Sequence, residues 1–556
     1  MNEMTTDVFE GDFPPVSYGS TLKEITRVVS RYLLATLVLM GMFSTFGAAS
    51  ELKVAKIFSD NMVLQRDMPV PVWGWADPGE KITVQFSGQK KSAIANADGK
   101  WMVRLNPLSA SAQPEELTVT GKSGRQEFTN LLVGDVWLCA GQSNMTLTFR
   151  DVPQEAASVE CFPQIRFMSA GNAIVPVPQD VISPYNNWVS CDRNTLPGFC
   201  RIGYYFGLKL WRELRIPIGL MNVAVGSSSI EAWMPPESFA VNQNWKDGNL
   251  AEMEKIQKIY REYNSYTNEE KERLFTEYFL TSYGWWSKNL LKDGKFSPEG
   301  YGSIFWHMRV TQSASLYNHA IRPMIPFGIK GVLWYQGETN YRDTHYAQKQ
   351  QAMIESWRRL WGQGDFPFYT VQVAPYVGGA DYIPKFWLEQ YAAVSKTKNS
   401  GIISTVDISS DNQGQHPENK RDVGLRLALL AIKDTYGRKN IVASGPTYKA
   451  MKIMDDKIIV SFDNTGSGLT TKDGKEPDSF EVAGADGRFY PAKSLIRVKK
   501  VVVSSPDVAA PVNVRYAWSH LANPNLRNKE GLPAFPFNTA EPFFKQKSNV
   551  KIRKME

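Results

Sequence analysis

The chain has 556 residues, a length that predicts two to four domains, and hydrophobic residues make up 43% of it, enough for several packed cores. Its formal net charge of +7 is spread thinly, without a long Lys/Arg run, which argues against nucleic acid as a partner. Four cysteines exclude a dense disulfide framework, and none of them stands in a Cys/His spacing typical of a metal site.

Residues 1–49 resemble a leader followed by an export signal. Lys23, Arg27 and Arg31 precede the apolar run Tyr32–Phe46, which ends in small residues that suit a signal peptidase. A retained membrane anchor is the alternative, because the run is near the lower length limit for a span. We expect cleavage, export to the periplasm or the exterior, and a mature protein without stable membrane insertion.

The four cysteines are compatible with one or two disulfides in an oxidising compartment. Cys191 and Cys200 enclose a loop that contains Pro and Gly, so they are the expected pair. Cys139 lies in an apolar run and is expected to be a buried, small apolar residue.

Residues 50–130 have the pattern of a small antiparallel β-sandwich. Short segments alternate apolar with polar residues and are separated by Asp/Pro/Gly turns. These segments are Met68–Trp75, Lys81–Phe86 and Trp101–Leu105.

Residues 131–437 alternate strands with helices, which predicts an α/β fold with a parallel sheet covered by helices on both faces. The expected strands are Val136–Ala140, Ile218–Val225, Ile329–Tyr335, Phe368–Ala374 and Ile402–Ile408. The expected helices are Arg201–Leu214, Tyr346–Trp361, Phe386–Lys396 and Glu418–Tyr436.

An insertion at about 236–305 separates the second and third of these strands. Within it, Leu250–Leu274 has helical spacing; it is expected to be either a solvated helical excursion or a wall of the substrate cleft. Residues 438–556 return to short strands and predict a second flanking β domain. Its expected strands are Lys457–Phe462, Ser479–Val482 and Val501–Val503.

Polar side chains follow several predicted strands directly. The first strand stops at Gly141 and is followed by Gln142, Ser143 and Asn144, the way in which α/β enzymes expose a nucleophile. A polar turn without chemistry is the alternative, since Ser and Asn are ordinary turn residues. The carboxyl ends of parallel strands meet at one sheet edge, so the residues that follow the other strands bear on this choice.

Three later stretches favour catalysis. Gly226 follows the second strand and allows a backbone N–H to approach a ligand closely, and Gln336, Glu338 and Asn340 follow the third. An uncharged amide there can donate to an oxyanion, whereas Glu338 is expected to support the loop. His416 lies in a loop after the fifth strand and is a candidate general base. The set predicts a serine hydrolase, although a Gly-x-Ser-x-Gly elbow is absent.

These stretches resemble the blocks of the sialate O-acetylesterase group within the SGNH (GDSL-like) hydrolases. The matching blocks are Gly141-Gln-Ser-Asn-Met145, Gly226–Trp233, Leu316-Tyr-Asn318, Trp334-Tyr-Gln-Gly-Glu-Thr-Asn340 and His416-Pro-Glu-Asn-Lys420. The resemblance covers roughly residues 131–436 and the β domain before them. It implies an SGNH-hydrolase-like parallel sheet with flanking β-sandwich domains.

The resemblance implies that Ser143 is the nucleophile and His416 the general base. Backbone N–H groups of Ser143 and Gly226, with a side-chain amide from Gln336 or Asn340, would form the oxyanion hole, and Gln142 and Glu338 would support it. The sequence departs from the family at two places. Ser227 stands where the family has a second glycine, and Gln413 stands where many SGNH enzymes place the aspartate of the triad. Asp411 or Asp407 is then the third member, or the site is a Ser–His dyad.

The implied activity is hydrolysis of O-acetyl esters of sialic acids, with release of acetate and without a metal or other cofactor. An esterase acting on xylan or another acetylated polysaccharide is the enzymatic alternative, and a non-catalytic glycan-binding protein is the alternative of another class. Arg150, Arg201 and Arg342 are candidates for contact with an anionic sugar, although each also suits a surface or structural role. The sequence makes no prediction of the oligomeric state.

Overall fold

The computed structural model describes residues 51–170, 178–182, 184–243, 249, 251, 254, 311–409 and 414–544. The predicted leader and signal, most of the predicted insertion, and Asp411 and Gln413 lie outside the described residues. Among the described residues, no helix has the length and apolar character needed to span a bilayer.

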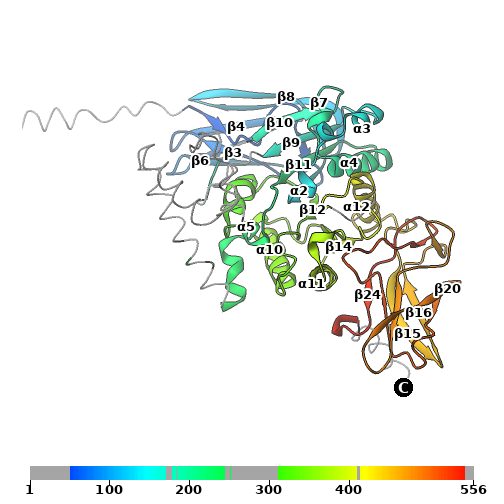
Figure 1. The fold of residues 1–556 in the computed structure, drawn as a ribbon. Coiled ribbons are helices and arrows are strands. Elements are labelled where there is room, and N and C mark those ends of the chain that lie inside the picture. The colour runs from blue at the N-terminus through cyan, green and yellow to red at the C-terminus, as the bar shows by residue number, and fades with distance from the viewer. Residues whose placement is uncertain are drawn as a thin grey trace, which may run out of the picture. The chain divides into compact units, whose positions relative to one another are not determined.

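The central sheet carries its strands in the order β10-β9-β11-β8-β12-β13-β14 (Figure 1). All neighbours from β9 to β14 pair in parallel, and β10 pairs antiparallel at one edge. The bounds are β8 Gly124–Gly141, β9 Ile165–Ala170, β10 Pro184–Ser190, β11 Ile218–Ala224, β12 Gly331–Tyr335, β13 Phe368–Val371 and β14 Ser400–Ile403. The predicted parallel sheet is therefore present, with an antiparallel strand added to it.

Three central strands end level with one another. Gly141 at the end of β8 is the register partner of Ala224 at the end of β11 and of Tyr335 at the end of β12. Residues that follow these strands therefore emerge side by side, which is the geometry that a shared site requires.

Helices cover both faces of the sheet because alternate residues of each strand point in opposite directions. Trp137 and Cys139 of β8 pack in one apolar cluster with α4 and α12, whereas Leu138 packs in the other with α5, α10 and α11. The helix bounds are α4 Arg201–Leu214, α5 Ile230–Trp233, α10 Tyr346–Trp361, α11 Tyr382–Lys396 and α12 Lys420–Asp434. Full burial of one large side chain such as Trp137 contributes about 2–3 kcal/mol to this packing.

Shorter helical segments lie in the connections: α2 Ser143–Thr146, η1 Phe149–Asp151, α3 Pro153–Ser158, η2 Leu196–Gly198, η3 Pro236–Val241, η5 Tyr317–Ile321, η6 Arg322–Met324 and η7 Val377–Gly379. The predicted bounds of α4 and α10 are confirmed, and each helix ends at a following residue with positive φ, Arg215 or Gly362. The predicted start of α12 at Glu418 is wrong, because the side chain of Asn419 accepts from the N–H of Asp422 and caps the helix there.

The predicted fifth strand, Ile402–Ile408, is mostly wrong, since β14 ends at Ile403. Its continuation is diverted by polar side chains: Ser404 Oγ donates to Gln372 Oε1 at 2.7 Å, and Thr405 Oγ1 donates to Gln372 O at 2.6 Å. Residues 404–409 therefore form a turn-rich connection toward His416.

The amino-terminal β region forms around the first half of β8. Its strands are β1 Lys53–Val54, β2 Val63–Gln65, β3 Val70–Trp75, β4 Lys81–Phe86, β5 Gln89–Ile94, β6 Lys100–Leu105 and β7 Ser111–Gly121. β1, β3 and β6 form one antiparallel sheet, and β4 and β7 extend a second sheet that contains β8. β8 thus runs without a break from the β region to Gly141, two residues before Ser143.

The described part of the carboxyl-terminal β region, residues 438–544, has three small antiparallel sheets, ordered β15-β16-β21-β20, β17-β23 and β19-β18-β22-β24. The bounds are β15 Thr447–Met454, β16 Lys457–Asp463, β17 Leu469–Thr471, β18 Phe480–Ala483, β19 Phe489–Pro491, β20 Lys493–Arg497, β21 Lys500–Ser504, β22 Asn513–Tyr516, β23 Leu526–Asn528 and β24 Phe537–Asn538. The three strands predicted in this region correspond to β16, β18 and β21.

The predicted disulfide between Cys191 and Cys200 is wrong, because all four cysteines are free thiols. Cys200 instead caps α4, where its Sγ accepts from the N–H of Gly203 at 3.5 Å, and it also contacts Met145 Sδ at 3.8 Å. Burial, and then the neighbouring Cys161, raise the pKa of the Cys191 thiol to about 12. Cys139 is fully buried, as its apolar surroundings predicted.

Candidate active site

The turn after β8 places Ser143 at the sheet edge. Gly141 has φ +136°, and a Cβ at this position would lie 2.1 Å from the carbonyl oxygen of Tyr335. The N–H of Gln142 donates to the same carbonyl at 2.9 Å, and α2 begins at Ser143. A glycine is thus required for the turn that delivers the half-buried serine to the surface.

Ser143 and His416 meet at this edge. The Nε2 atom of His416 lies 2.7 Å from the Oγ atom of Ser143, a distance suited to a hydrogen bond from the hydroxyl to a neutral imidazole. Partial burial, and then the charge of Lys420, lower the pKa of His416 below its ordinary value of 6.5. The ring is therefore in its neutral, proton-accepting form at pH 7.

The side chain of Gln336 is fully buried and its hydrogen bonds are complete. Its Nε2 donates to Ser228 O at 2.9 Å and to Asn340 Oδ1 at 2.8 Å, while its Oε1 accepts from the hydroxyl of Tyr346 at 2.7 Å. Both amide hydrogens are used within the protein, so Gln336 orients Asn340.

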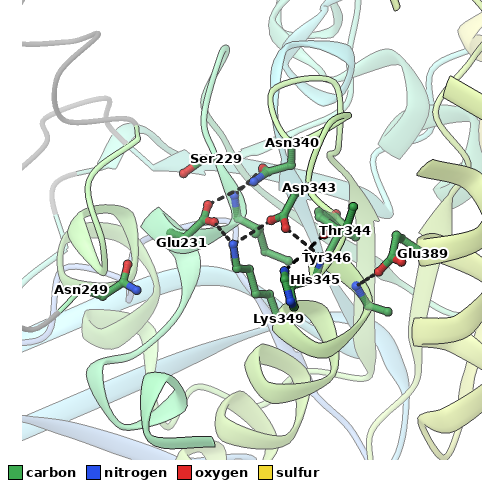
Figure 2. A network of polar contacts seen from close by, with 12 residues as sticks. Ser229, Glu231, Asn249, Asn340, Asp343, Thr344, His345, Tyr346, Lys349 and Glu389 are labelled. Atoms are coloured by element: carbon green, nitrogen blue, oxygen red, sulfur yellow. Dashed lines mark hydrogen bonds and ion pairs between the residues drawn. The ribbon is translucent and has the colours of Figure 1, made fainter. Parts of the chain in front are cut away.

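The side chain of Asn340 makes a different set of hydrogen bonds. Its Oδ1 accepts from the N–H of Ile230 at 2.9 Å as well as from Gln336, and its Nδ2 donates to Glu231 Oε2 at 3.1 Å (Figure 2). An amide nitrogen carries two hydrogens, so the second remains for an oxygen of a bound ligand. Of the two amides that the sequence singled out, Asn340 is the one equipped to donate.

Glu231 belongs to an ionic network that fixes this amide. Lys349 Nζ lies 2.6 Å from Glu231 Oε1 and 2.7 Å from Asp343 Oδ2, between the two carboxylates (Figure 2). Burial opposes ionisation of Glu231, but the Lys349 charge and the hydrogen bonds outweigh it, so the pKa of Glu231 is lowered. Sequence reasoning missed this network, apart from the position of Glu231 in the block that begins at Gly226.

Two residues that could supply backbone donors, Ser143 and Gly226, lie at this edge. The N–H of Ser143 belongs to the first residue of α2 and has no acceptor within that helix. Gly226 follows β11, whose continuation is tied to the serine turn by a bond from the N–H of Val225 to Gly141 O at 2.9 Å. Ser227 has φ +56°, a conformation that favours glycine, the residue that the resembling family has at this position.

Asn144, which follows the nucleophile, is a junction that sequence reasoning missed. Its Nδ2 donates to Glu338 Oε1 at 2.6 Å and to Gln415 O at 2.9 Å, and its Oδ1 accepts from Lys420 Nζ at 2.6 Å. Glu338 is 5% exposed, and burial raises its pKa to about 7. The support expected from Glu338 therefore acts on the nucleophile turn through Asn144.

Gln142 supports the loop after β12, because its Oε1 accepts from the N–H of Gly337 at 3.2 Å.

Asp407, one of the two alternatives for a third triad member, is committed to a different partner. Its two carboxylate oxygens accept from Arg426 at 2.8 and 3.0 Å, and both side chains are buried. A carboxylate with both oxygens paired to a guanidinium in this way fastens the loop to α12. The other alternative, Asp411, lies outside the described residues.

The three candidate arginines differ in their surroundings. Arg201 is buried and paired with Glu155 and with the carbonyl of Glu418, so it has a structural role. Arg342 is exposed, with its guanidinium 5.2 Å from the ring of Tyr341 and 4.9 Å from that of Tyr382. Arg150 is exposed in η1. Within the described parts of the chain, no three His, Cys, Asp or Glu side chains cluster as metal ligands would.

Comparisons with known proteins show which proteins this chain resembles. A family model described as carbohydrate esterase, sialic acid-specific acetylesterase, matches residues 300–433. The sialate O-acetylesterase of Mus musculus is 25% identical over 515 residues, which cover 84% of this chain and 89% of the mouse protein. The Homo sapiens sialate O-acetylesterase is 24% identical over 539 residues, covering 87% and 92%.

A solved structure, a carbohydrate acetylesterase from Xanthomonas citri, is 32% identical with a TM-score of 0.72, covering 88% of this chain and 99% of that one. The fold and these relatives define a carbohydrate acetylesterase. The chain belongs to the sialate O-acetylesterase family, as its sequence blocks predicted.

Proposed function

We propose that this protein hydrolyses O-acetyl esters of sialic acids through a covalent acetyl–Ser143 intermediate. The observation that carries this proposal is the 2.7 Å contact between Ser143 Oγ and His416 Nε2 at the level ends of three central strands. The chain order of nucleophile, donors and base supports an SGNH type of catalytic sheet. Sialic acid is chosen because the family model and the curated relatives carry it in their names.

Each step of the proposed reaction has a residue that performs it. His416 Nε2 takes the hydroxyl proton while Ser143 Oγ forms a bond to the acetyl carbonyl carbon. The resulting oxyanion accepts hydrogen bonds from the N–H groups of Ser143 and Gly226 and from the second hydrogen of Asn340 Nδ2. The ester bond to the sugar then breaks, and the sugar oxygen takes the proton from His416.

Water completes the cycle. The oxygen of a water molecule attacks the acetyl group on Ser143 while His416 accepts a proton from that water. Acetate leaves when the bond to Oγ breaks. The proton returns to Ser143 Oγ through the imidazole. The residues form a working Ser–His dyad, and a third member from the loop before His416 would add orientation of the ring. We place the reaction outside the cytoplasm, in line with the export signal expected in residues 1–49.

The test is acetate release from O-acetylated sialic acid and, in parallel, from acetylated xylan. Protein from Ser50 onward is compared with Ser143→Ala and with Ser158→Ala, an exposed serine of α3 that serves as the control. We expect release from the sialic acid by the parent and the control, lowered by several orders of magnitude in Ser143→Ala. Release from xylan alone would keep the mechanism and change the substrate.

A fluorophosphonate probe separates the enzyme from a glycan-binding protein. The probe should label Ser143 in the parent protein and leave the Ser143→Ala variant unlabelled. Absence of both labelling and acetate release in folded parent protein would overturn the proposed function.

A further inference from the structure

The peptide carbonyls on both sides of His416 are bonded to side chains. Gln415 O accepts from Asn144 Nδ2 at 2.9 Å, and Pro417 O accepts from Lys420 Nζ at 2.6 Å. The same Nζ donates to Asn144 Oδ1 at 2.6 Å, which joins the two contacts. Since Asn144 follows Ser143 directly, this arrangement ties the backbone around His416 to the nucleophile turn.

If the side chain at position 420 only filled space in the core, a lysine would be an unfavourable residue there. It is 0% exposed, and it is the first residue of α12, where the partial positive charge of a helix start disfavours a cation. A hydrophobic side chain of similar volume is commonly at least as stabilising as a buried charge. The burial of a lysine here therefore points to a requirement beyond stability.

We infer that Lys420 is a positioning residue, which holds His416 at hydrogen-bonding distance from Ser143 by linking Pro417 O to the side chain of Asn144. This inference rests on the proposed function. Lys420 Nζ bonds to Asn144 Oδ1 and Pro417 O, so it acts on the reaction through the backbone that carries the base. Glu338, bonded to the other side of Asn144, is the counter-charge of this link.

The charged and titratable neighbours of Lys420 come from three elements. Burial lowers the pKa of Lys420 to about 7; Glu338 after β12 opposes this shift, Arg201 of α4 adds to it, and Cys200 before α4 opposes it. In turn, the Lys420 charge contributes to the lowered pKa of His416. Loss of that charge should therefore raise the pKa at which His416 takes up a proton.

The test compares Lys420→Met with Lys433→Met, the same change at a partly exposed lysine near the end of α12. We expect kcat of Lys420→Met to fall about 10²-fold with little change in KM, because a shift of about 1 Å in a reacting group has an effect of that order. The rate of fluorophosphonate labelling should fall in parallel. The acid limb of kcat/KM should move to higher pH, a change that loss of packing alone does not produce.

A double variant, Lys420→Met with Glu338→Gln, addresses stability. Lys420→Met leaves the Glu338 carboxylate without its counter-charge, so it should lower the midpoint of thermal unfolding, and the second change should restore part of that loss. Restored stability with kcat still low supports the positioning role. Recovery of kcat together with stability would overturn it.

Two further outcomes separate this inference from the proposed function. If the parent protein releases acetate and Lys420→Met matches Lys433→Met in kcat and in pH profile, the positioning role is overturned while the proposed function stands. If the parent protein neither releases acetate nor reacts with the probe, the failure belongs to the proposed function.

Discussion

Ser143 and His416 are separated by 273 positions in the chain, and the fold brings Oγ and Nε2 to 2.7 Å. Neither residue lies in a long helix or strand: Ser143 begins the four-residue α2, and His416 lies in the loop before α12. Their distance is therefore set by the loops that carry them and by the side chains that fasten those loops.

The acid limb of the pH–rate profile should lie below pH 6.5. His416 accepts a proton only when neutral, and burial lowers its pKa from the ordinary value of 6.5, so activity should be complete at pH 7 and be lost as pH falls through that lowered pKa. The measurement is kcat/KM for acetate release between pH 4 and pH 8. A midpoint above 6.5 would contradict the assignment of His416 as a base in this environment.

Asn340→Ala should lower kcat by about 10²–10³-fold, the usual effect of removing one oxyanion donor. The change in KM should be small because the bond is strongest in the transition state. Steady-state kinetics give both constants, and Asn194→Ala, at an exposed position before η2, is the control. A raised KM with unchanged kcat would place Asn340 in substrate binding.

Glu231→Ala should lower kcat by about tenfold by releasing the Asn340 amide from its oriented position. Lys349 keeps Asp343 as a partner in this variant, so the loss of stability should be modest, about 1–3 kcal/mol. Kinetics and denaturant unfolding measure the two effects. Glu237→Ala, which removes a more exposed carboxylate 3.6 Å from Arg359, should change neither.

Asp407→Asn should lower the free energy of unfolding and leave kcat almost unchanged. The change leaves the Arg426 guanidinium buried without its counter-charge, which costs about 3–5 kcal/mol. Acetate release measured well below the unfolding midpoint should have a kcat close to that of the parent. A loss approaching the ~10⁴-fold effect of disabling a triad acid would instead show that Asp407 serves His416.

Gly141→Ala should destabilise the fold more than Gly437→Ala. Both glycines have positive φ, but a Cβ at residue 141 would meet Tyr335 O at 2.1 Å, whereas one at residue 437 meets nothing within 4 Å. Backbone strain is also larger at residue 141, because φ +136° lies outside the left-handed region that contains residue 437 at φ +69°, so the difference between the two unfolding free energies measures this strain and the clash together. Equal losses would show that the serine turn relaxes without cost.

The sequence predicted best where one physical rule acts alone. Apolar runs that stop at polar residues located the carboxyl ends of β8, β11 and β12, because parallel strands buried on both faces have that pattern. The bounds of α4 and α10 followed from periodicity. The residues after the predicted strands included Ser143 and His416 as candidate nucleophile and base, the family blocks imply the same roles, and the fold places the two side chains in contact.

Tertiary contacts determine the features that could not be predicted from the sequence. Lys420 begins a helix four residues after His416, a position at which a lysine is usually on the surface. Its burial depends on Asn144 and Glu338, which come from distant segments. The pairing of Cys191 with Cys200 failed because proximity in the chain does not determine which thiols meet in space. The choice between Gln336 and Asn340 required the partners of both amides to be known.

The shared strand β8 has a consequence for how the protein is made. During synthesis its first half can pair with β7, a near neighbour in the chain, before most of the catalytic region has left the ribosome. The nucleophile strand then has an amino-terminal half already in register when β11 and β12 arrive to flank it. Removal of the residues up to 130 would take away the part of β8 that pairs with β7, and with it the paired strand on which the catalytic sheet forms. The amino-terminal β region therefore contributes to the folding of the serine turn.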